Sequence, residues 1–348
     1  MKKKLAALAL FAAAVFALSA CSTKVTVSLN RNWNYNTTAA YDASFYEQLT
    51  YDVRYTESES GSTNGLKYTG LSGTYTVTTQ AAIYHRLSDG LTVTQAYKQT
   101  TVLEVSATIA DKDGNAVYAF GGETGVPADK ITSTVWFRDT SDGLAPFESS
   151  TEVYSHTPVN AAIGVYSYKT SVSYNESGSK AEIAVTDTSS AVTEESDKIS
   201  IGTFGDSSYN LSKLTKSYSC FDNEQLLFAG RGLTFESGSS NKVTVVSATG
   251  GKQTVTLSCK EIVSSDYSFL LDGEQVSGSI SACSVQFSLT GTDNTGVTHS
   301  VRYAARNENA SANKYRNLPL LIESPIAYSM GTLSYVLTAA THTAPSQG

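Results

Sequence analysis

Apolar and polar residues alternate with a period of two along most of the chain, which predicts β-strands. The clearest example is Val165 to Tyr174, where tyrosine and valine side chains share one face and serine and lysine side chains share the other. A second strand, Ala181 to Thr186, follows the loop Asn175 to Gly178, whose asparagine and glycine tolerate positive φ. We therefore predict a hairpin of two half-buried strands.

The same pattern recurs on both sides of this hairpin. Residues 243–249 and 254–263 flank Gly250-Gly251, and residues 284–289 and 297–304 flank a loop rich in Gly, Asp and Asn. Further strands are predicted at 50–56, 73–84, 91–109, 115–121, 131–138 and 332–339. Consecutive hairpins form an antiparallel meander, so the expected fold class is all-β. We expect a curved antiparallel sheet, either a half-barrel or a sandwich-like meander.

One segment breaks the alternation and predicts a short helix of two to three turns. Asp222 is suited to the N-cap, Gln225 follows three residues later, and Leu226, Leu227 and Phe228 come next before two nearby glycines end the segment. The apolar side chains suit packing against the concave side of a sheet.

The N-terminus has a basic start, an apolar run and then small residues. Lysines occupy positions 2–4, the run extends from Leu5 to Leu18, and Ser19 and Ala20 follow. This order is typical of a secretory signal peptide, which we assign to residues 1–20. The run of about 14 residues covers roughly 21 Å as a helix, which is short of a hydrocarbon core of about 30 Å. We expect it to target the chain for export and not to span the membrane.

The sequence Leu18-Ser19-Ala20-Cys21 resembles the lipobox of bacterial lipoproteins. The resemblance implies that the Cys21 thiol is acylated and becomes the new N-terminus. Several acyl chains hold a protein stably, at about 0.8 kcal/mol per buried CH₂. The mature chain is then expected to be extracytoplasmic and lipid-anchored to the bacterial membrane. An ordinary signal peptide cut near Ala20 is the alternative.

We divide the rest of the chain by its pattern. Residues 21–30 are expected to be the lipidated cysteine and a short tether, and residues 343–348 a tail. Residues 31–342 form the antiparallel β-rich region, as one domain or as two subdomains with a boundary near 187–215. We place the boundary there because the stretch from Thr186 to Lys198 is rich in Ser, Thr and Glu and lacks aromatic residues.

Composition supports strands and disfavours nucleic acid as a partner. Charged residues make up only 16% of the chain, and there are 21 tyrosines, which suit half-buried pleated surfaces. The formal net charge is -7, and because three of the 25 Lys and Arg residues precede Cys21, the mature chain carries -10. A chain this acidic would be repelled by phosphate backbones.

Three cysteines remain once Cys21 is lipidated. We predict a disulfide between Cys259 and Cys283, which would close a loop of roughly 25 residues and contribute about 3 kcal/mol. The alternative is that all three are buried free thiols. Cys220 lies just before the predicted helix, and a helix N-terminus lowers the pKa of a thiol. No partner base is identifiable for it, so packing is the favoured role.

The last 130 or so residues resemble an envelope domain family of unknown function. The resemblance rests on Phe221 to Arg231, two following hairpins, Tyr303-Ala304-Ala305, Leu318-Pro319 and Gly331 to Tyr335. Such domains are similar in outline to the curved half-barrels of lipoprotein carriers and lipid-binding lipoproteins, often plugged by a short helix. This chain has Gly230 where that family usually has a larger residue.

The resemblance implies an apolar groove that holds acyl chains or an extended hydrophobic partner. Its lining would include the side chains Leu226, Leu227, Phe228, Tyr303 and Tyr335. The same residues are equally able to build a closed and filled core, so both arrangements remain open at this point.

The chain lacks recognisable catalytic and cofactor motifs. Its four histidines, at positions 85, 156, 299 and 342, show no metal-ligand spacing, and His342 is expected in a frayed tail. Neither a nucleophile elbow nor a glycine-rich phosphate loop is found. We therefore expect no catalytic residues, no metal and no cofactor.

Three hypotheses follow for the function. The favoured one is a non-catalytic, membrane-anchored envelope lipoprotein that binds a lipid or other hydrophobic ligand in a β-groove. The second is a structural lipoprotein that contacts an envelope protein or a glycan, for which Trp33 is a candidate stacking residue. The third is an unrecognised surface hydrolase, which would need convergent polar groups with perturbed pKa values.

Overall fold

The computed structural model describes twelve stretches of the chain: 41–86, 92–140, 143–156, 163–175, 178–188, 207–211, 220–232, 237–238, 240–248, 251–290, 298–305 and 317–343. The predicted signal peptide, Cys21, the tether at 21–30 and Trp33 lie outside the described residues, as do most of the tail and of the subdomain boundary. The description below concerns the β-rich region.

Within the described stretches, sixteen strands join into one sheet. In chain order they are β1 (Tyr46–Glu57), β2 (Leu66–Arg86), β3 (Thr92–Asp111), β4 (Ala116–Phe120), β5 (Asp129–Thr140), β6 (Gly143–Ser155), β7 (Tyr166–Tyr174), β8 (Lys180–Asp187), β9 (Ser207–Asn210), β10 (Cys220–Asp222), β11 (Ser240–Ser247), β12 (Gly251–Leu271), β13 (Glu274–Thr290), β14 (Thr298–Ala304), β15 (Pro319–Ile326) and β16 (Gly331–Thr341). The predicted all-β fold class is confirmed.

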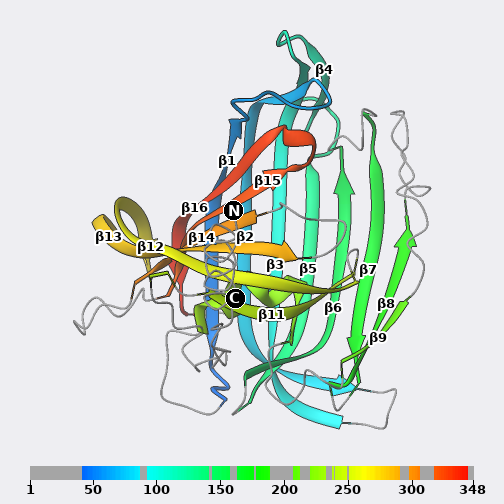
Figure 1. Ribbon diagram of the computed structural model, residues 1–348, viewed down its shortest axis with the longest axis vertical. Helices are drawn as coiled ribbons and strands as arrows, with labels where there is room; N and C mark the ends of the chain where they lie inside the picture. The colour runs from blue at the N-terminus through cyan, green and yellow to red at the C-terminus, as the bar shows by residue number, and fades with distance from the viewer. Residues whose placement is uncertain are drawn as a thin grey trace, which may run out of the picture.

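The sheet joins the two halves of the chain through its first and last strands. Spatial order runs β10-β11-β12-β13-β14-β15-β16-β1-β2-β3-β5-β6-β7-β8-β9, with β4 beside β3 (Figure 1). The pairings are antiparallel except for β10 with β11 and a short contact of β12 with β16. The long strands curve, so that β11–β14 cross in front of β2–β6 in the view of Figure 1.

Curvature brings the two ends of the sheet together through side chains. Tyr209 of β9 and Leu211 pack with Val246 of β11, in a cluster that also holds side chains of β7 and β8. The Lys252 ammonium on β12 donates to the Asn210 carbonyl at 3.2 Å. The wall is therefore barrel-like, with a seam between β9 and the β11–β12 hairpin that side chains fill.

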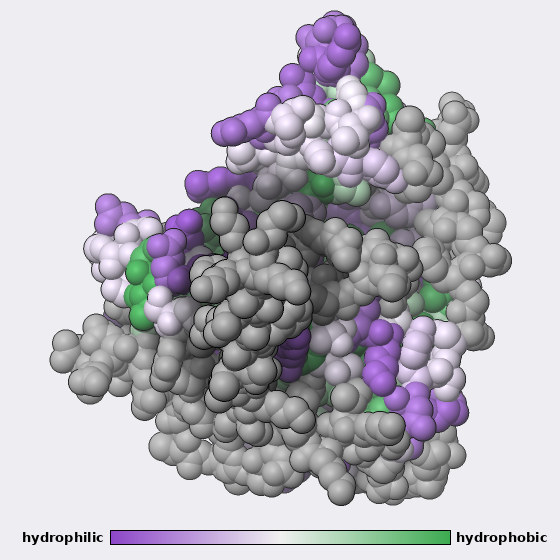
Figure 2. Space-filling view, in the orientation of Figure 1, coloured by the Kyte–Doolittle hydropathy of each residue, from purple (hydrophilic) through white to green (hydrophobic). Residues whose placement is uncertain are grey.

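Alternating inward residues create the core. On β1, Leu49, Tyr51 and Val53 are buried, whereas Asp52 and Arg54 between and beyond them face solvent. The main cluster contains residues from twelve of the sixteen described strands, so the core is the interior of the curved sheet. Outside, the turn between β3 and β4 at the upper end is strongly hydrophilic (Figure 2).

The predicted short helix is present. A 3₁₀ turn, η3 (Asn223–Gln225), leads into α2 (Leu226–Ala229), and η4 (Gly230–Gly232) ends it. The Asp222 carboxylate accepts from the Glu224 backbone N–H at 2.9 Å, as an N-cap should. We call residues 223–232 the plug. A further 3₁₀ turn, η6 (Ala327–Ser329), joins β15 to β16.

Candidate functional site

The plug packs into the concave side of the sheet. Leu226 and Phe228 are buried in the main cluster, and Leu227 is partly buried against it. The Tyr303 hydroxyl of β14 donates to the Leu227 carbonyl. These four side chains thus belong to packed contacts around the plug, whereas Tyr335 of β16 borders a cavity described below.

Gly230 lets the plug approach the wall closely. A Cβ at this position would lie 2.5 Å from the Tyr303 hydroxyl oxygen and 3.3 Å from the ring of Phe287. Its φ is -54°, so the glycine is needed for space and not for backbone conformation. A larger side chain at this position would therefore require the Tyr303 side chain to move.

A buried ion pair holds the C-terminal end of the plug. Arg231 Nη1 and Nη2 donate to the two carboxylate oxygens of Glu47 at 2.5 and 3.1 Å, and both side chains are 2–3% exposed. Arg231 Nε also donates to the Asn317 carbonyl at 3.1 Å. Burial alone would raise the pKa of Glu47, but Arg231 and then His342 outweigh it and lower the pKa to about 2.

His342 completes this cluster, so its expected place in a frayed tail is wrong. Its backbone N–H donates to Asp272 Oδ1 at 2.7 Å, its Nδ1 lies 3.0 Å from Asp272 Oδ2, and its Nε2 lies 3.4 Å from Glu47 Oε2. Burial lowers the pKa of His342, but the two carboxylates outweigh burial and raise it. The end of β16 is therefore fixed by charge to β1 and to the β12–β13 turn.

A buried carboxyl holds the other end of the plug. Asp222 Oδ2 accepts from the Ser149 hydroxyl of β6 at 2.7 Å and from the Tyr174 hydroxyl of β7 at 2.8 Å. Burial, followed by the charge of Glu224, raises the pKa of Asp222 to about 7. The plug is thus joined to opposite parts of the wall by one polar group at each end.

Cys220 lies beside this carboxyl, and its thiol has a raised pKa. Burial, followed by the charge of Asp222, raises the pKa of its thiol to about 12. The thiol packs against the cluster at the seam. The expected effect of a helix N-terminus is absent because desolvation and a neighbouring carboxyl act in the opposite direction.

A cavity of about 240 Å³ lies inside the curved sheet, away from the plug. The lining strands are β15 and β16 on one side of β1, and β2, β3, β4, β5 and β6 on its other side. Most lining side chains are apolar. They are Tyr68, Leu71, Leu103, Val105, Phe120, Ile131, Pro325, Ile326, Leu333 and Tyr335, with Asp129, Ser155 and Ser324 as the polar members.

Asp129 and Ser155 belong to a buried polar group at the cavity wall. Asp129 Oδ2 accepts from the Ser155 hydroxyl at 2.7 Å, and its Oδ1 accepts from the His156 backbone N–H at 2.8 Å. His156 Nδ1 lies 2.7 Å from the same oxygen. The His156 ring is fully buried and stacks on Phe120 at 4.9 Å between ring centroids.

This group contains serine, histidine and aspartate without the connectivity of a hydrolase triad. A triad needs the serine hydroxyl on the imidazole and the imidazole on the carboxylate. Here the Ser155 hydroxyl donates to Asp129, so the serine and the histidine bind the same carboxylate. The printed contacts are those of a shared carboxylate acceptor and differ from the serine–imidazole–carboxylate order of a triad.

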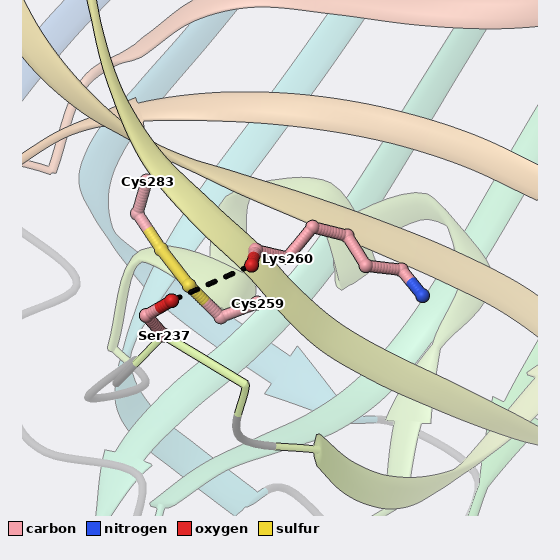
Figure 3. The surroundings of a disulfide bond; sticks show 4 residues. All are labelled: Ser237, Cys259, Lys260 and Cys283. Atoms are coloured by element: carbon pink, nitrogen blue, oxygen red, sulfur yellow. Dashed lines mark hydrogen bonds between the residues drawn. A yellow bond between two sulfur atoms is a disulfide. The ribbon is translucent and has the colours of Figure 1, made fainter.

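Cys259 and Cys283 form a disulfide between β12 and β13 (Figure 3). Their Cα atoms are 6.5 Å apart, and 24 residues separate them in sequence. A bulge in β12 between Cys259 and Glu261 brings the two side chains together. The Ser237 hydroxyl donates to the Lys260 carbonyl in this bulge at 3.4 Å, as Figure 3 shows.

Within the described stretches, no three His, Cys, Asp or Glu side chains are grouped to hold a metal ion. Of the helices in those same stretches, none combines the length and apolar character needed to cross a membrane.

Sequence reasoning missed Glu47, Arg231, Asp129 and His156 as site residues. Glu47 carried a usable signal, because it falls in register with the inward residues Phe45 and Leu49. A charged residue in an apolar stripe indicates a buried partner. Asp129 has the same register relation to the inward residues Val135 and Phe137, whereas Arg231 and His156 lie outside the strands.

Comparison with known proteins yields a distant structural likeness. No family model matches the chain, and no curated protein matches it. One solved structure that it resembles is a β-barrel-like protein of the domain of unknown function DUF1849 from Brucella abortus. The TM-score is 0.42 and the identity 7%, over 87% of this chain and all of the other. The function is therefore argued from this chain's own residues.

Proposed function

We propose that the mature chain is a non-catalytic, membrane-anchored lipoprotein of the bacterial envelope that holds a hydrophobic ligand inside its curved sheet. The observation that carries the proposal is the apolar cavity of about 240 Å³ between β15–β16 and β2–β6. Ligand sites are concave and mainly apolar, with a few polar groups, typically at about 300 Å³ or more. This cavity is somewhat smaller, so it suits one acyl chain or a ligand of that size.

Two features support this assignment over the alternatives, and a third defines where the ligand space lies. The lipobox-like sequence ending at Cys21 favours a lipid anchor. The polar group around Asp129 has the connectivity of a structural network, which favours binding over hydrolysis. The plug occupies the remainder of the concave side, so the ligand space differs from the groove that the sequence suggested.

Native mass spectrometry of the mature chain tests the proposal. The chain would be produced in its own host with Cys21→Ser, which removes the lipid anchor, and then transferred to the spectrometer without denaturation. We expect an apolar molecule bound at one per chain, identified after organic extraction. A ligand-free mass, together with no binding of added medium-chain amphiphiles, would contradict the proposal.

A second function, contact with a glycan or an envelope protein, is favoured by one observation on the outer face. Tyr84 stacks on Phe147 with ring centroids 4.7 Å apart and lies 5.5 Å from Trp136. The Lys98 ammonium and the Arg138 guanidinium lie over rings of this cluster. Trp136→Ala would weaken retention on insoluble cell-wall glycan if this face binds it, and unchanged retention would remove this candidate.

A further inference from the structure

We propose that the cavity selects an uncharged amphiphile whose head group donates a hydrogen bond, and that it rejects a fatty acid of equal chain length. This inference rests on the proposed function, since it concerns the ligand of the same cavity. The observation behind it is the placement of one carboxylate, that of Asp129, in an otherwise apolar lining.

Hydrogen-bond donors approach both carboxylate oxygens of Asp129. It accepts from the Ser155 hydroxyl at 2.7 Å and from the His156 backbone N–H at 2.8 Å, with His156 Nδ1 2.7 Å away. Donors directed at both carboxylate oxygens stabilise the negative charge. Only 9% of the residue is exposed, so solvent screens this charge weakly.

The rest of the described lining contains no cationic side chain to balance a second negative charge. Among the described residues that border the cavity, none is Lys, Arg or His, and the remaining polar members are the serines at 155 and 324. The Lys130 side chain, next to Asp129 in sequence, faces outward instead. Its ammonium lies 3.7 Å from the exposed carboxylate of Glu104.

A ligand carboxylate entering this space would therefore meet a like charge in weakly screened surroundings. Like charges at short range in such surroundings repel strongly, and a desolvated carboxylate without a cation is costly in itself. A hydroxyl or amide head instead presents a donor to an acceptor-rich group. Fatty alcohols, monoacylglycerols and fatty amides share this chemistry, so the class is defined by the head group and not by one compound.

The test compares 1-decanol with decanoate on the delipidated mature chain carrying Cys21→Ser. Isothermal titration calorimetry at pH 8 measures both, because decanoate is then ionised. We expect decanol to bind at least about tenfold more tightly than decanoate. Asp129→Asn keeps a side-chain acceptor for the backbone N–H of His156. In this variant decanoate should bind more tightly, so that the affinities for decanol and decanoate differ by no more than about threefold.

Glu104→Gln is the matched control, because it removes a carboxylate on the opposite face of the sheet from the cavity. The ratio of its decanol affinity to its decanoate affinity should equal that of the unmodified chain. Equal binding of decanol and decanoate to the unmodified chain overturns the inference while leaving the proposed function in place. A ratio that Asp129→Asn does not change also overturns it. Failure of both probes to bind overturns the proposed function and this inference together.

Discussion

Replacing Asp222 with asparagine should remove a large pH dependence from the stability of the fold. Burial, followed by the charge of Glu224, raises the pKa of Asp222 to about 7, from an ordinary value of 3.8. The folded chain thus holds this proton more tightly than the unfolded chain. The resulting stabilisation is complete below the unfolded pKa and is lost as the pH rises through about 7.

The size follows from the shift. About three pKa units at roughly 1.4 kcal/mol each correspond to roughly 4 kcal/mol of unfolding free energy. Asparagine has no proton to lose in this range, and its amide oxygen can still accept from the Glu224 N–H. Relative to Asp222→Asn, the unmodified chain should therefore lose roughly 4 kcal/mol between pH 4 and pH 8.

Urea unfolding of both chains, followed by circular dichroism at half-unit pH intervals, measures this difference. Glu47 and His342 also titrate, but they are common to both chains and cancel. Asp52→Asn, which removes an exposed carboxylate beside Arg54, is the matched control. A difference between the unmodified chain and Asp222→Asn that stays constant from pH 4 to pH 8 would refute the reasoning.

Three further changes probe the plug and the disulfide. Glu47→Gln leaves the Arg231 guanidinium buried without its anion and should lower the free energy of unfolding, measured in urea, by about 3–5 kcal/mol. Adding Arg231→Met should recover part of that loss. A loss under about 1 kcal/mol would contradict the buried pair. Phe228→Ala should cost about 3–5 kcal/mol, whereas an unchanged midpoint would place this ring outside the core. Reduction of Cys259–Cys283 should cost about 3 kcal/mol, and insensitivity of the unfolding midpoint to reductant would count against the bridge.

Local pattern was sufficient for most of the sheet. The hairpin at β7–β8 and those at β11–β12 and β13–β14 are confirmed, because alternation and turn residues are encoded within about 20 adjacent positions. Four strands were missed, and one of them, β10, has only three residues. β6 contains Pro146 and a run of serine and glutamate, β15 begins and nearly ends with proline, and β9 has four residues. These segments form strands because they pair with neighbouring strands of the sheet, and the alternation within each segment does not predict that pairing.

The site was less predictable, because its contacts join distant parts of the chain. Arg231 and Glu47 are 184 residues apart, and they meet only because β16 pairs with β1 and the plug folds back into the curve. The cavity is likewise lined by strands from both halves of the chain. From sequence we identified one of its lining residues, Tyr335, but not Asp129. The plug residues were identified as apolar, but alternation could not decide whether they face an open groove or a packed one.

The central claim, that the cavity holds the ligand, is tested most directly by filling it. Leu103 of β3 lines the cavity, and its neighbour Val102 is not among the lining residues, because adjacent residues of a strand face opposite sides. We predict that Leu103→Trp abolishes calorimetric binding of 1-decanol and that Val102→Trp, with an equal circular dichroism spectrum, retains it. Retained binding in a folded Leu103→Trp chain would contradict the account.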